Sequence, residues 1–332
     1  MKPVVAILNG ICRLVWTSIV LAVSSAPTFA HADEAMEILQ RIAHSVRRLT
    51  YDGTFVYRHG DTLETSRIAH AVVDGRELER IEVLDGSPRE IVRDARELKC
   101  FLPDEKRVLI EDIALQDGES RRFPALLPLR LSSLLDHYSI RLGAQGRVAG
   151  LPSRAVLLEP RDNLRYGHEL WVDNASGLLL KAVLRNERGA ALESFAFTQL
   201  KVGGPLAPDR LKPHFDAQGV QVHHVRTVDV KSEGLGWNFR TMLPGFRRVM
   251  AMKRQPMADR PESLHVVFSD SLATISVFIE PGSPTAPVEE SVNLGAINLY
   301  RRQLDEYRVL VMGEAPFAAV KLLGDGIERK RK

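Results

Sequence analysis

The stretch that decides the fold begins Tyr51-Asp52-Gly53-Thr54-Phe55-Val56-Tyr57 and continues to Val202. It consists of short β-rich segments, each closed by a cluster of Gly, Asp, Asn or Pro. These residue types favour chain reversal, because Gly, Asn and Asp tolerate positive φ and Pro fixes φ without an amide donor. The clusters recur roughly every ten residues, which is typical of consecutive hairpins rather than βαβ units. The sequence therefore predicts one large, curved antiparallel sheet.

The segments expected to form strands differ in how strictly they alternate. Residues 78–84 and 97–101 alternate in part, which predicts polar side chains facing water on one side of the sheet. Residues 126–138 are rich in leucine and are expected to form a short helix or a lid across the sheet. The expected strands are 54–57, 78–84, 97–101, 108–111, 139–142, 153–159, 168–172, 178–185 and 192–200.

A helix is expected over residues 33–49, just before the sheet. Its apolar residues follow helical spacing and form one stripe: Ala35, Leu39, Ile42, Val46 and Leu49. Acidic residues lie in its first turn and arginines in its last, as the helix dipole favours. Such a helix needs an apolar surface, and we expect it on the concave face of the sheet.

Residues 1–32 have the pattern of a secretory signal peptide. Lys2 precedes an apolar run, and Ala30-His31-Ala32 supplies a small-residue cleavage site before Asp33. Arg13 interrupts the apolar run, which makes the segment less suited to spanning a bilayer. The sequence predicts an exported protein with a cleaved signal peptide, and a retained membrane anchor is the alternative.

Charge and cysteine content limit the classes of function. The net charge of +3 falls to +1 without residues 1–32, which hold Lys2 and Arg13 and no acid. This balance argues against a nucleic-acid binder, in which a basic excess is usual. Cys12 lies in the expected signal peptide, so Cys100 has no internal disulfide partner. We expect Cys100 to be a small buried side chain rather than a reactive thiol.

A smaller domain of mixed helices and strands is expected after a linker, which makes the fold class α+β. The linker contains Pro205, Pro208 and Pro213, and proline at this density opposes helices and central strands. The expected divisions are signal peptide 1–32, first domain 33–204, linker 205–219, second domain 220–328 and a basic, solvated tail 329–332. In the second domain we expect strands at 222–225, 249–253, 264–269, 274–280, 294–299 and 307–312 and a helix at 316–323.

Recognisable catalytic and metal-binding motifs are absent from the sequence. It has no H-E-x-x-H, G-x-S-x-G, Walker or G-x-G-x-x-G segment. His223 and His224 are adjacent, so in a strand they point to opposite faces and cannot share a metal ion. We expect a binding protein without cofactor or metal rather than an enzyme. An exported hydrolase whose site is assembled from distant residues is the alternative.

A curved sheet with a helix on its concave face favours an apolar hollow for a lipid or another small molecule. Aromatic and leucine side chains of the first domain are the candidates for its lining. Each of them also fits a closed core, which is the competing interpretation. The candidates are Phe55, Tyr57, Phe101, Leu102, Leu126, Leu127 and Trp171.

A surface for a protein partner is expected in residues 237–254. Aromatic, Met and Arg side chains are concentrated there, and these types are enriched at protein interfaces. The segment Leu243-Pro244-Gly245-Phe246 also fits a turn that packs Phe246 inside. The candidates for partner contact are Trp237, Phe239, Phe246, Arg247 and Arg248.

Short segments spread over the chain carry a resemblance to a known family. They are residues 51–57, Leu170-Trp171-Val172-Asp173 with Gly177-Leu178-Leu179-Leu180, Leu243-Pro244-Gly245-Phe246, Phe268-Ser269-Asp270-Ser271-Leu272 with Ser276-Val277-Phe278-Ile279, Gly295-Ala296-Ile297-Asn298, and Val311-Met312-Gly313-Glu314-Ala315-Pro316. In this order, and with the export signal and two domains, the chain resembles the RseB/MucB regulators of the envelope-stress sigma factor (AlgU/sigma-E type) of Gram-negative bacteria.

The resemblance implies a periplasmic negative regulator. Such proteins bind the periplasmic domain of a membrane-anchored anti-sigma factor of the RseA/MucA type and shield it from site-1 proteolysis, and lipid or lipopolysaccharide fragments are implied to release it. The first domain would have the open half-barrel fold of LolA and LolB, and the second would supply much of the anti-sigma contact. A lipid or lipoprotein carrier is the alternative function, and a homo-oligomer stays open.

Overall fold

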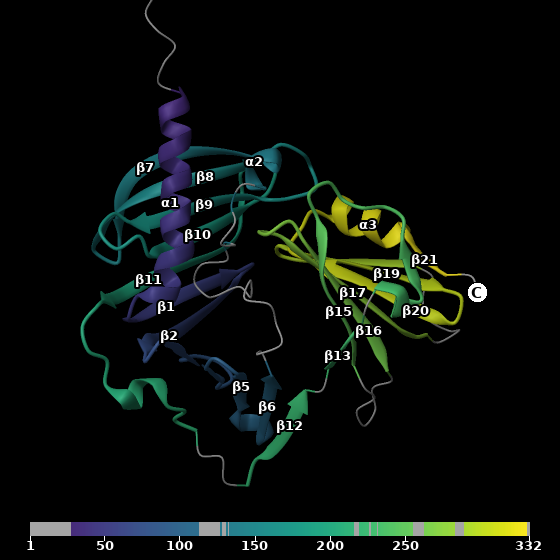
Figure 1. Ribbon diagram of the computed structural model, residues 1–332, viewed down its shortest axis with the longest axis horizontal. Helices are drawn as coiled ribbons and strands as arrows, with labels where there is room; N and C mark the ends of the chain where they lie inside the picture. The colour runs from purple at the N-terminus through teal and green to yellow at the C-terminus, as the bar shows by residue number, and fades with distance from the viewer. Residues whose placement is uncertain are drawn as a thin grey trace, which may run out of the picture.

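Two large β-sheets, joined by an extended segment, make up most of the computed structural model, and β14 (Trp237–Phe239) and β21 (Ile327–Arg329) pair as a small third sheet (Figure 1). It describes residues 28–112, 127, 131, 133–215, 219–225, 227–230, 232–254, 262–282 and 289–330. Within these residues no helix is long and apolar enough to cross a membrane.

The larger sheet has twelve strands within the described residues, in the order β12-β6-β5-β4-β3-β2-β1-β11-β10-β9-β8-β7. Neighbouring strands are antiparallel except β12, which lies parallel to β6. The strands are β1 (Tyr51–His59), β2 (Thr62–Val73), β3 (Arg76–Val83), β4 (Glu90–Arg93), β5 (Glu97–Leu102), β6 (Arg107–Asp112), β7 (Tyr138–Val148), β8 (Leu151–Pro160), β9 (Gly167–Asp173), β10 (Leu179–Arg185), β11 (Ala191–Val202) and β12 (Gln221–Val225).

Helix α1 (Thr28–Arg48) covers one face of this sheet, which we call the inner face, and lies against β7 and β8 (Figure 1). Its stripe residues Leu39, Ile42 and Val46 are buried in one core with Tyr51 and Phe55 of β1. The prediction of an amphipathic helix packed on the sheet is confirmed, although α1 begins before the expected residue 33. The short helix α2 (Leu134–His137) leads into β7, while residues 126, 128–130 and 132 of the expected lid lie outside the described part.

Shortening Leu39 to Ala should lower the free energy of unfolding by about 2–5 kcal/mol, because truncating a fully buried leucine leaves a cavity between α1 and the sheet. Gln40→Ala changes the exposed neighbour of Leu39 and should cost less than about 0.5 kcal/mol. Urea unfolding of both variants measures the difference. Equal losses would contradict the packing of α1 against the sheet.

Two strands of the larger sheet, β2 and β4, were not among the expected ones. β2 buries Ser66 and His70, so its sequence lacks a clear apolar alternation. The expectation that polar residues of segment 78–84 face water is wrong for Glu79 and Arg80, which are both buried. Arg80 is buried because it pairs with Glu90 of β4, a contact that alternation alone does not predict.

The smaller sheet has seven strands within the described residues, in the order β13-β15-β16-β17-β20-β19-β18, all antiparallel. Helix α3 (Phe317–Asp325) packs Ala319, Val320 and Leu323 into the core of this sheet. The remaining elements are β13 (Thr227–Asp229), β14 (Trp237–Phe239), β15 (Arg247–Arg254), β16 (Ser263–Ser269), β17 (Thr274–Pro281), β18 (Glu289–Leu294), β19 (Ile297–Leu304), β20 (Tyr307–Gly313), β21 (Ile327–Arg329) and the 3₁₀ helices η1 (Pro103–Glu105), η2 (Pro208–Leu211) and η3 (Ser232–Leu235).

The predicted fold class is confirmed: a large curved antiparallel sheet carries a helix on one face, and a smaller, separate sheet follows. The strand expected at 294–299 is wrong at its start, because Gly295-Ala296 is the turn between β18 and β19. Residues 222–225 form a strand as expected, but this strand is β12 of the larger sheet. The domain boundaries themselves stay a prediction.

Candidate functional site at the joint between the sheets

The two sheets meet through loops at one end of each, and we call this contact the joint. From the first sheet it takes the β8–β9 loop, α2 and the end of β1, and from the second the turns before β15, β16–β17 and β18–β19. Its residues are His59, His137, Tyr138, Leu164, Arg165 and Tyr166 on one side and Pro244, Gly245, Phe246, Asp270, Leu272, Gly295 and Asn298 on the other.

A buried ion pair lies at the centre of the joint. Arg165 Nη1 donates to Asp270 Oδ2 over 2.5 Å, and neither side chain is exposed to solvent. The guanidinium also donates through Nη2 to the carbonyl oxygen of Pro244 and through Nε to Asp162. Burial disfavours the charge on Arg165, but the bond to Asp162 and the charge of Asp270 outweigh it and raise the pKa of Arg165. The ion pair between the two sheets is therefore shielded from water, and both of its charged groups have hydrogen-bond partners.

Asp270 is held in place by three further groups. Its Oδ1 accepts the backbone N–H groups of Leu272 and Ala273, at 2.9 and 2.7 Å. Its Oδ2 also accepts from the hydroxyl of Tyr138 over 3.2 Å. Burial, together with the nearby charge of Asp270, raises the pKa of Tyr138, so this hydroxyl stays protonated and donates. The guanidinium of Arg165 itself also lies over the ring of Phe246, 5.2 Å from its centre.

Apolar contacts and a close backbone approach complete the joint. Leu272 of the second sheet is buried in the core of the first, and Leu164 of the first packs against the core of the second. Asn298 donates to the hydroxyl of Tyr166 over 2.9 Å. Gly245 has φ +76°, and a Cβ there would overlap the ring of His137, so only glycine fits.

The joint gathers segments that carried the family resemblance. Leu243-Pro244-Gly245-Phe246, Phe268 to Leu272 and Gly295 to Asn298 are far apart in sequence, yet all three face the first sheet. Their chemistry is that of an internal interface: turns, buried hydrogen bonds and one ion pair. Three of the segments that carry the resemblance therefore lie at the contact between the two sheets.

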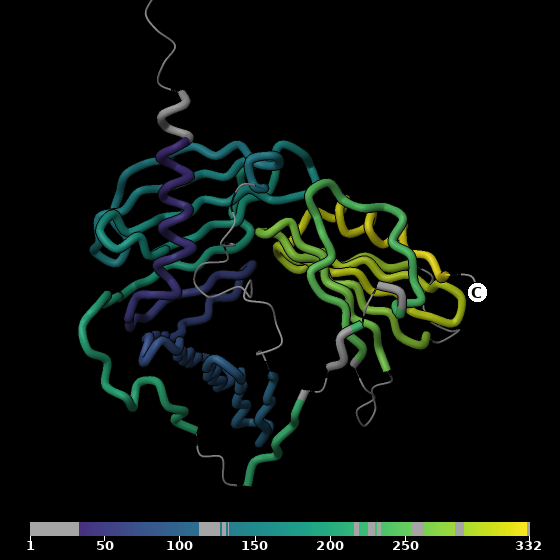
Figure 2. The backbone as a smooth tube through the Cα atoms, viewed as in Figure 1, coloured from purple at the N-terminus to yellow at the C-terminus, as the bar shows by residue number. Residues whose placement is uncertain are grey.

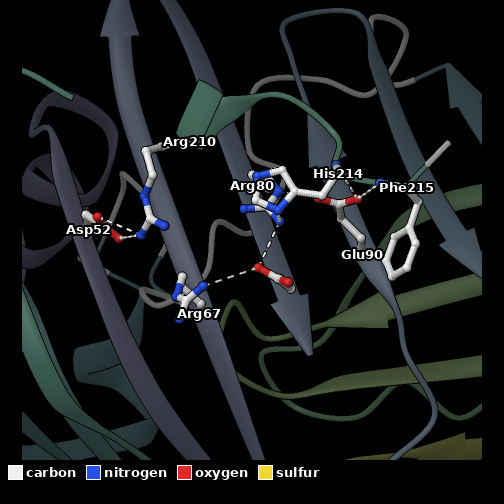
Figure 3. Close-up of polar contacts among 8 residues, drawn as sticks. Asp52, Arg67, Arg80, Glu90, Arg210, His214 and Phe215 are labelled. Atoms are coloured by element: carbon white, nitrogen blue, oxygen red, sulfur yellow. Dashed lines mark hydrogen bonds and ion pairs between the residues drawn. The ribbon is translucent and has the colours of Figure 1, made fainter. Parts of the chain in front are cut away.

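The connecting segment, which Figure 2 shows running from β11 toward β12, makes a second contact with β1–β4. It lies on the face to which Asp52 and Arg80 point, since their neighbours Tyr51 and Ile81 face the core under α1, and we call this the outer face. We call residues 208–215 the strap. Arg210 donates to both carboxylate oxygens of Asp52, at 2.6 and 2.8 Å. Farther along, the backbone N–H groups of His214 and Phe215 donate to Glu90 (Figure 3). The predicted linker is therefore bound along the outer face.

Three candidate lining residues are brought together on the inner face, and others are not. Phe55 and Leu127 are buried in the core under α1, and Tyr57 packs against it. The strand register puts Phe101 opposite Glu90 on the outer face, and Trp171 also faces outward between Leu170 and Val172 of the core. Lipid binding stays a prediction for this set. Leu102 is partly buried, and Leu126 lies outside the described residues.

The candidate partner residues are spread over the second sheet. Phe246 is buried at the joint, which agrees with the interpretation of its segment as a turn. Phe239 packs against Phe268, and Arg247 and Arg248 are exposed at the start of β15. Trp237 lines a cleft of about 1280 Å³ beside Tyr307, between β14–β21 and the β19–β20 hairpin. Their role in partner contact stays a prediction.

Another cleft, of about 570 Å³, lies between α1 and β7–β9. Ile38, Leu142 and Val172 supply its apolar lining, and Arg41 and Arg154 its cations. None of the candidate lining residues that the structure describes borders it. In the described part of the chain, no three His, Cys, Asp or Glu side chains are grouped so that they could hold a metal ion.

Sequence reasoning missed the charged residues that hold the contacts: Arg80, Glu90, Arg165, His214 and Asp270. Arg165 and Asp270 are 105 residues apart, and no spacing rule connects them. A signal was available for Asp270, because an Asp between two serines before an apolar residue favours a turn in which the carboxylate accepts nearby backbone N–H groups. The turn could be predicted from the sequence, but the pairing of Asp270 with Arg165 could not.

Comparison with known proteins gives a consistent result. Family models described as the MucB/RseB N-terminal domain and the MucB/RseB C-terminal domain match residues 34–215 and 231–328. The sigma factor AlgU regulatory protein MucB of Pseudomonas aeruginosa is 32% identical over 316 residues, which cover 92% of this chain and 95% of MucB. The sigma-E factor regulatory protein RseB of Salmonella typhimurium is 25% identical over 308 residues, covering 90% and 92%. A solved complex of P. aeruginosa MucA and MucB matches with TM-score 0.72 and 31% identity, over 90% of this chain and 100% of that one.

Proposed function

Since the chain belongs to the MucB/RseB family, we propose that it is a periplasmic regulator that binds the periplasmic domain of a membrane-anchored anti-sigma factor and shields it from site-1 proteolysis. On this proposal the anti-sigma factor survives while the regulator is bound, and the sigma factor stays captive. The chain acts by binding and not by catalysis. A cleaved signal peptide, residues 1–32, delivers it to the periplasm.

The observation that carries the proposal is the similarity to a MucB chain solved together with MucA. That similarity extends over 90% of this chain and so includes both sheets, not one domain alone. The relatives that share most of this chain's length are named as regulatory proteins of sigma factors. Binding to an anti-sigma factor of the MucA type is therefore the function that this chain's relatives favour.

We further propose that a lipid or lipopolysaccharide fragment, bound by the first sheet, releases the anti-sigma factor. Tyr57, a candidate lining residue, donates its hydroxyl to Glu193 over 2.7 Å. His59, two residues on, lies 4.0 Å from the same carboxylate and packs against Gly295 of the second sheet. A ligand that displaces Tyr57 would act on the joint through Glu193 and His59, which provides a route for coupling between two sites.

Protease protection tests both parts of this proposal. The mature protein should slow cleavage of the purified periplasmic domain of its anti-sigma factor by the site-1 protease, and added lipopolysaccharide should restore cleavage. An unrelated protein at equal concentration serves as the control. No capture of that domain at micromolar concentration would contradict the regulator. If lipopolysaccharide does not reduce the protection, only the proposed release of the anti-sigma factor is contradicted. A lipid carrier would leave cleavage unchanged with and without lipopolysaccharide.

A further inference from the structure

The strap is fastened by a hydrogen bond that only a neutral histidine ring can accept. Arg80 Nη2 lies 2.7 Å from Nδ1 of His214. A guanidinium has N–H donors and no acceptor, so Nδ1 of His214 must offer its lone pair. A protonated imidazole carries N–H groups on both nitrogens and has no lone pair to offer. The observed contact and a protonated His214 therefore exclude each other.

The carboxylates beside His214 already have partners. Glu90 is fully buried and accepts from Arg80 Nε and from the backbone N–H groups of His214 and Phe215. Glu82 accepts from Arg80 Nη2 over 2.8 Å and lies 3.7 Å from Arg67. Both oxygens of Glu90 are already used by Arg80 and the strap backbone, so Glu90 cannot turn to a protonated His214 ring without giving up one of these bonds.

The charges around His214 balance when its ring is neutral. Two cations, Arg67 and Arg80, oppose two anions, Glu82 and Glu90. On the strap itself, Asp209 bonds to Lys212 at the surface, where that bond lowers the pKa of Asp209, and Arg210 is neutralised by Asp52. A proton on His214 would add an unbalanced cation in direct contact with Arg80, which is almost entirely buried. His214 is itself exposed, so water screens part of the repulsion, and the main penalty of protonation is the loss of the acceptor that Nδ1 offers to Arg80.

We propose that the strap is a pH-sensitive fastener, docked on the outer face while His214 is neutral and released when the His214 ring takes up a proton. Release takes the backbone N–H groups of His214 and Phe215 away from Glu90 and leaves the Arg80–Glu90 pair in the sheet. The strap then stays attached through Arg210 and Asp52, and the connection becomes free over residues 212–215. The proposal rests on the contacts of the strap alone and is independent of any anti-sigma factor.

Distance measurement between two nitroxide labels tests the fastener in the mature chain. One label goes on Lys212→Cys in the strap and the other on Arg76→Cys at the β2–β3 turn, both exposed positions, in a Cys100→Ser background. Samples are frozen at about pH 7.5 and about pH 5, on either side of the range in which histidine titrates. We expect one narrow distance at the higher pH and a broad distribution at the lower.

His214→Asn is the decisive variant, because its side-chain oxygen can accept from Arg80 near the position of Nδ1 but does not titrate. It should keep the narrow distance at both pH values. His224→Asn, a control in β12, should respond to acid as the wild-type strap does. The proposal is overturned if acid leaves the wild-type distance unchanged, if His214→Asn broadens in acid as the wild type does, or if His214→Asn is already broad at the higher pH. Circular dichroism at both pH values confirms that the sheets stay folded.

Discussion

Replacing Asp270 by Asn should lower the free energy of unfolding by about 3–5 kcal/mol, because it leaves Arg165 buried at the joint without its main counter-charge. This loss of stability should arise at the joint, because the Asp270 carboxylate also accepts hydrogen bonds from the Tyr138 hydroxyl and from two backbone N–H groups. Urea unfolding followed by circular dichroism measures it. We also expect the unfolding transition to broaden or divide, because the two sheets lose their shared pair.

The control for this prediction is an arginine–carboxylate pair of this protein that is exposed to solvent. Arg141 and Glu159 form a bidentate pair that lowers the pKa of Glu159, but their side chains are 54% and 53% exposed. Glu159→Gln should therefore cost no more than about 1 kcal/mol. Replacing Arg165 and Asp270 together by apolar residues should restore part of the stability, since neither charge is then left alone. A single Asp270→Asn variant as stable as Glu159→Gln would contradict the role of the joint.

Glu90→Gln should have an effect of similar size on the other side of the first sheet. Arg80 is 2% exposed and Glu90 is not exposed, so the variant leaves a guanidinium buried without its closest counter-charge. We expect a loss of about 3–5 kcal/mol in the free energy of unfolding. The strap should also be more open to proteolysis near Lys212, because the backbone N–H groups of His214 and Phe215 lose a charged acceptor.

Glu82→Gln is the matched control for Glu90, because Glu82 bonds to the same arginine but is 22% exposed. Its loss should be near 1 kcal/mol, since water can solvate what the variant leaves unpaired. If the two variants lose equal stability, burial is not what makes the Arg80–Glu90 pair important. If Glu90→Gln leaves proteolysis of the strap unchanged, Glu90 does not hold the strap.

The features that sequence predicts well here are local ones. The Gly, Asp and Asn clusters mark turns because the required φ values are a property of single residues, and so the hairpins of β7–β11 were expected. The stripe of Leu39, Ile42 and Val46 predicts α1 because helical spacing is fixed by the backbone. These patterns need no knowledge of what the element will touch.

The features that sequence misses depend on partners brought from elsewhere. β2 was missed because it buries Ser66 and His70, whose polar groups look solvent-facing until their neighbours are known. Arg80 was expected in water for the same reason. The prolines of the connecting segment predict irregular backbone correctly, but they say nothing of Arg210 and His214, whose partners Asp52 and Arg80 come from β1 and β3. Long-range charge pairing leaves no periodic trace in a sequence.

The place of β12 has a consequence for dividing this protein into modules. β12 follows the connecting segment, yet it supplies the outermost strand of the larger sheet through five residue pairs with β6. A truncation at the end of β11 would strip that strand away and bare the main-chain donors and acceptors of β6, a surface that invites edge-to-edge aggregation. A first module that folds on its own therefore has to extend to Val225, and so it includes the whole segment between β11 and β12.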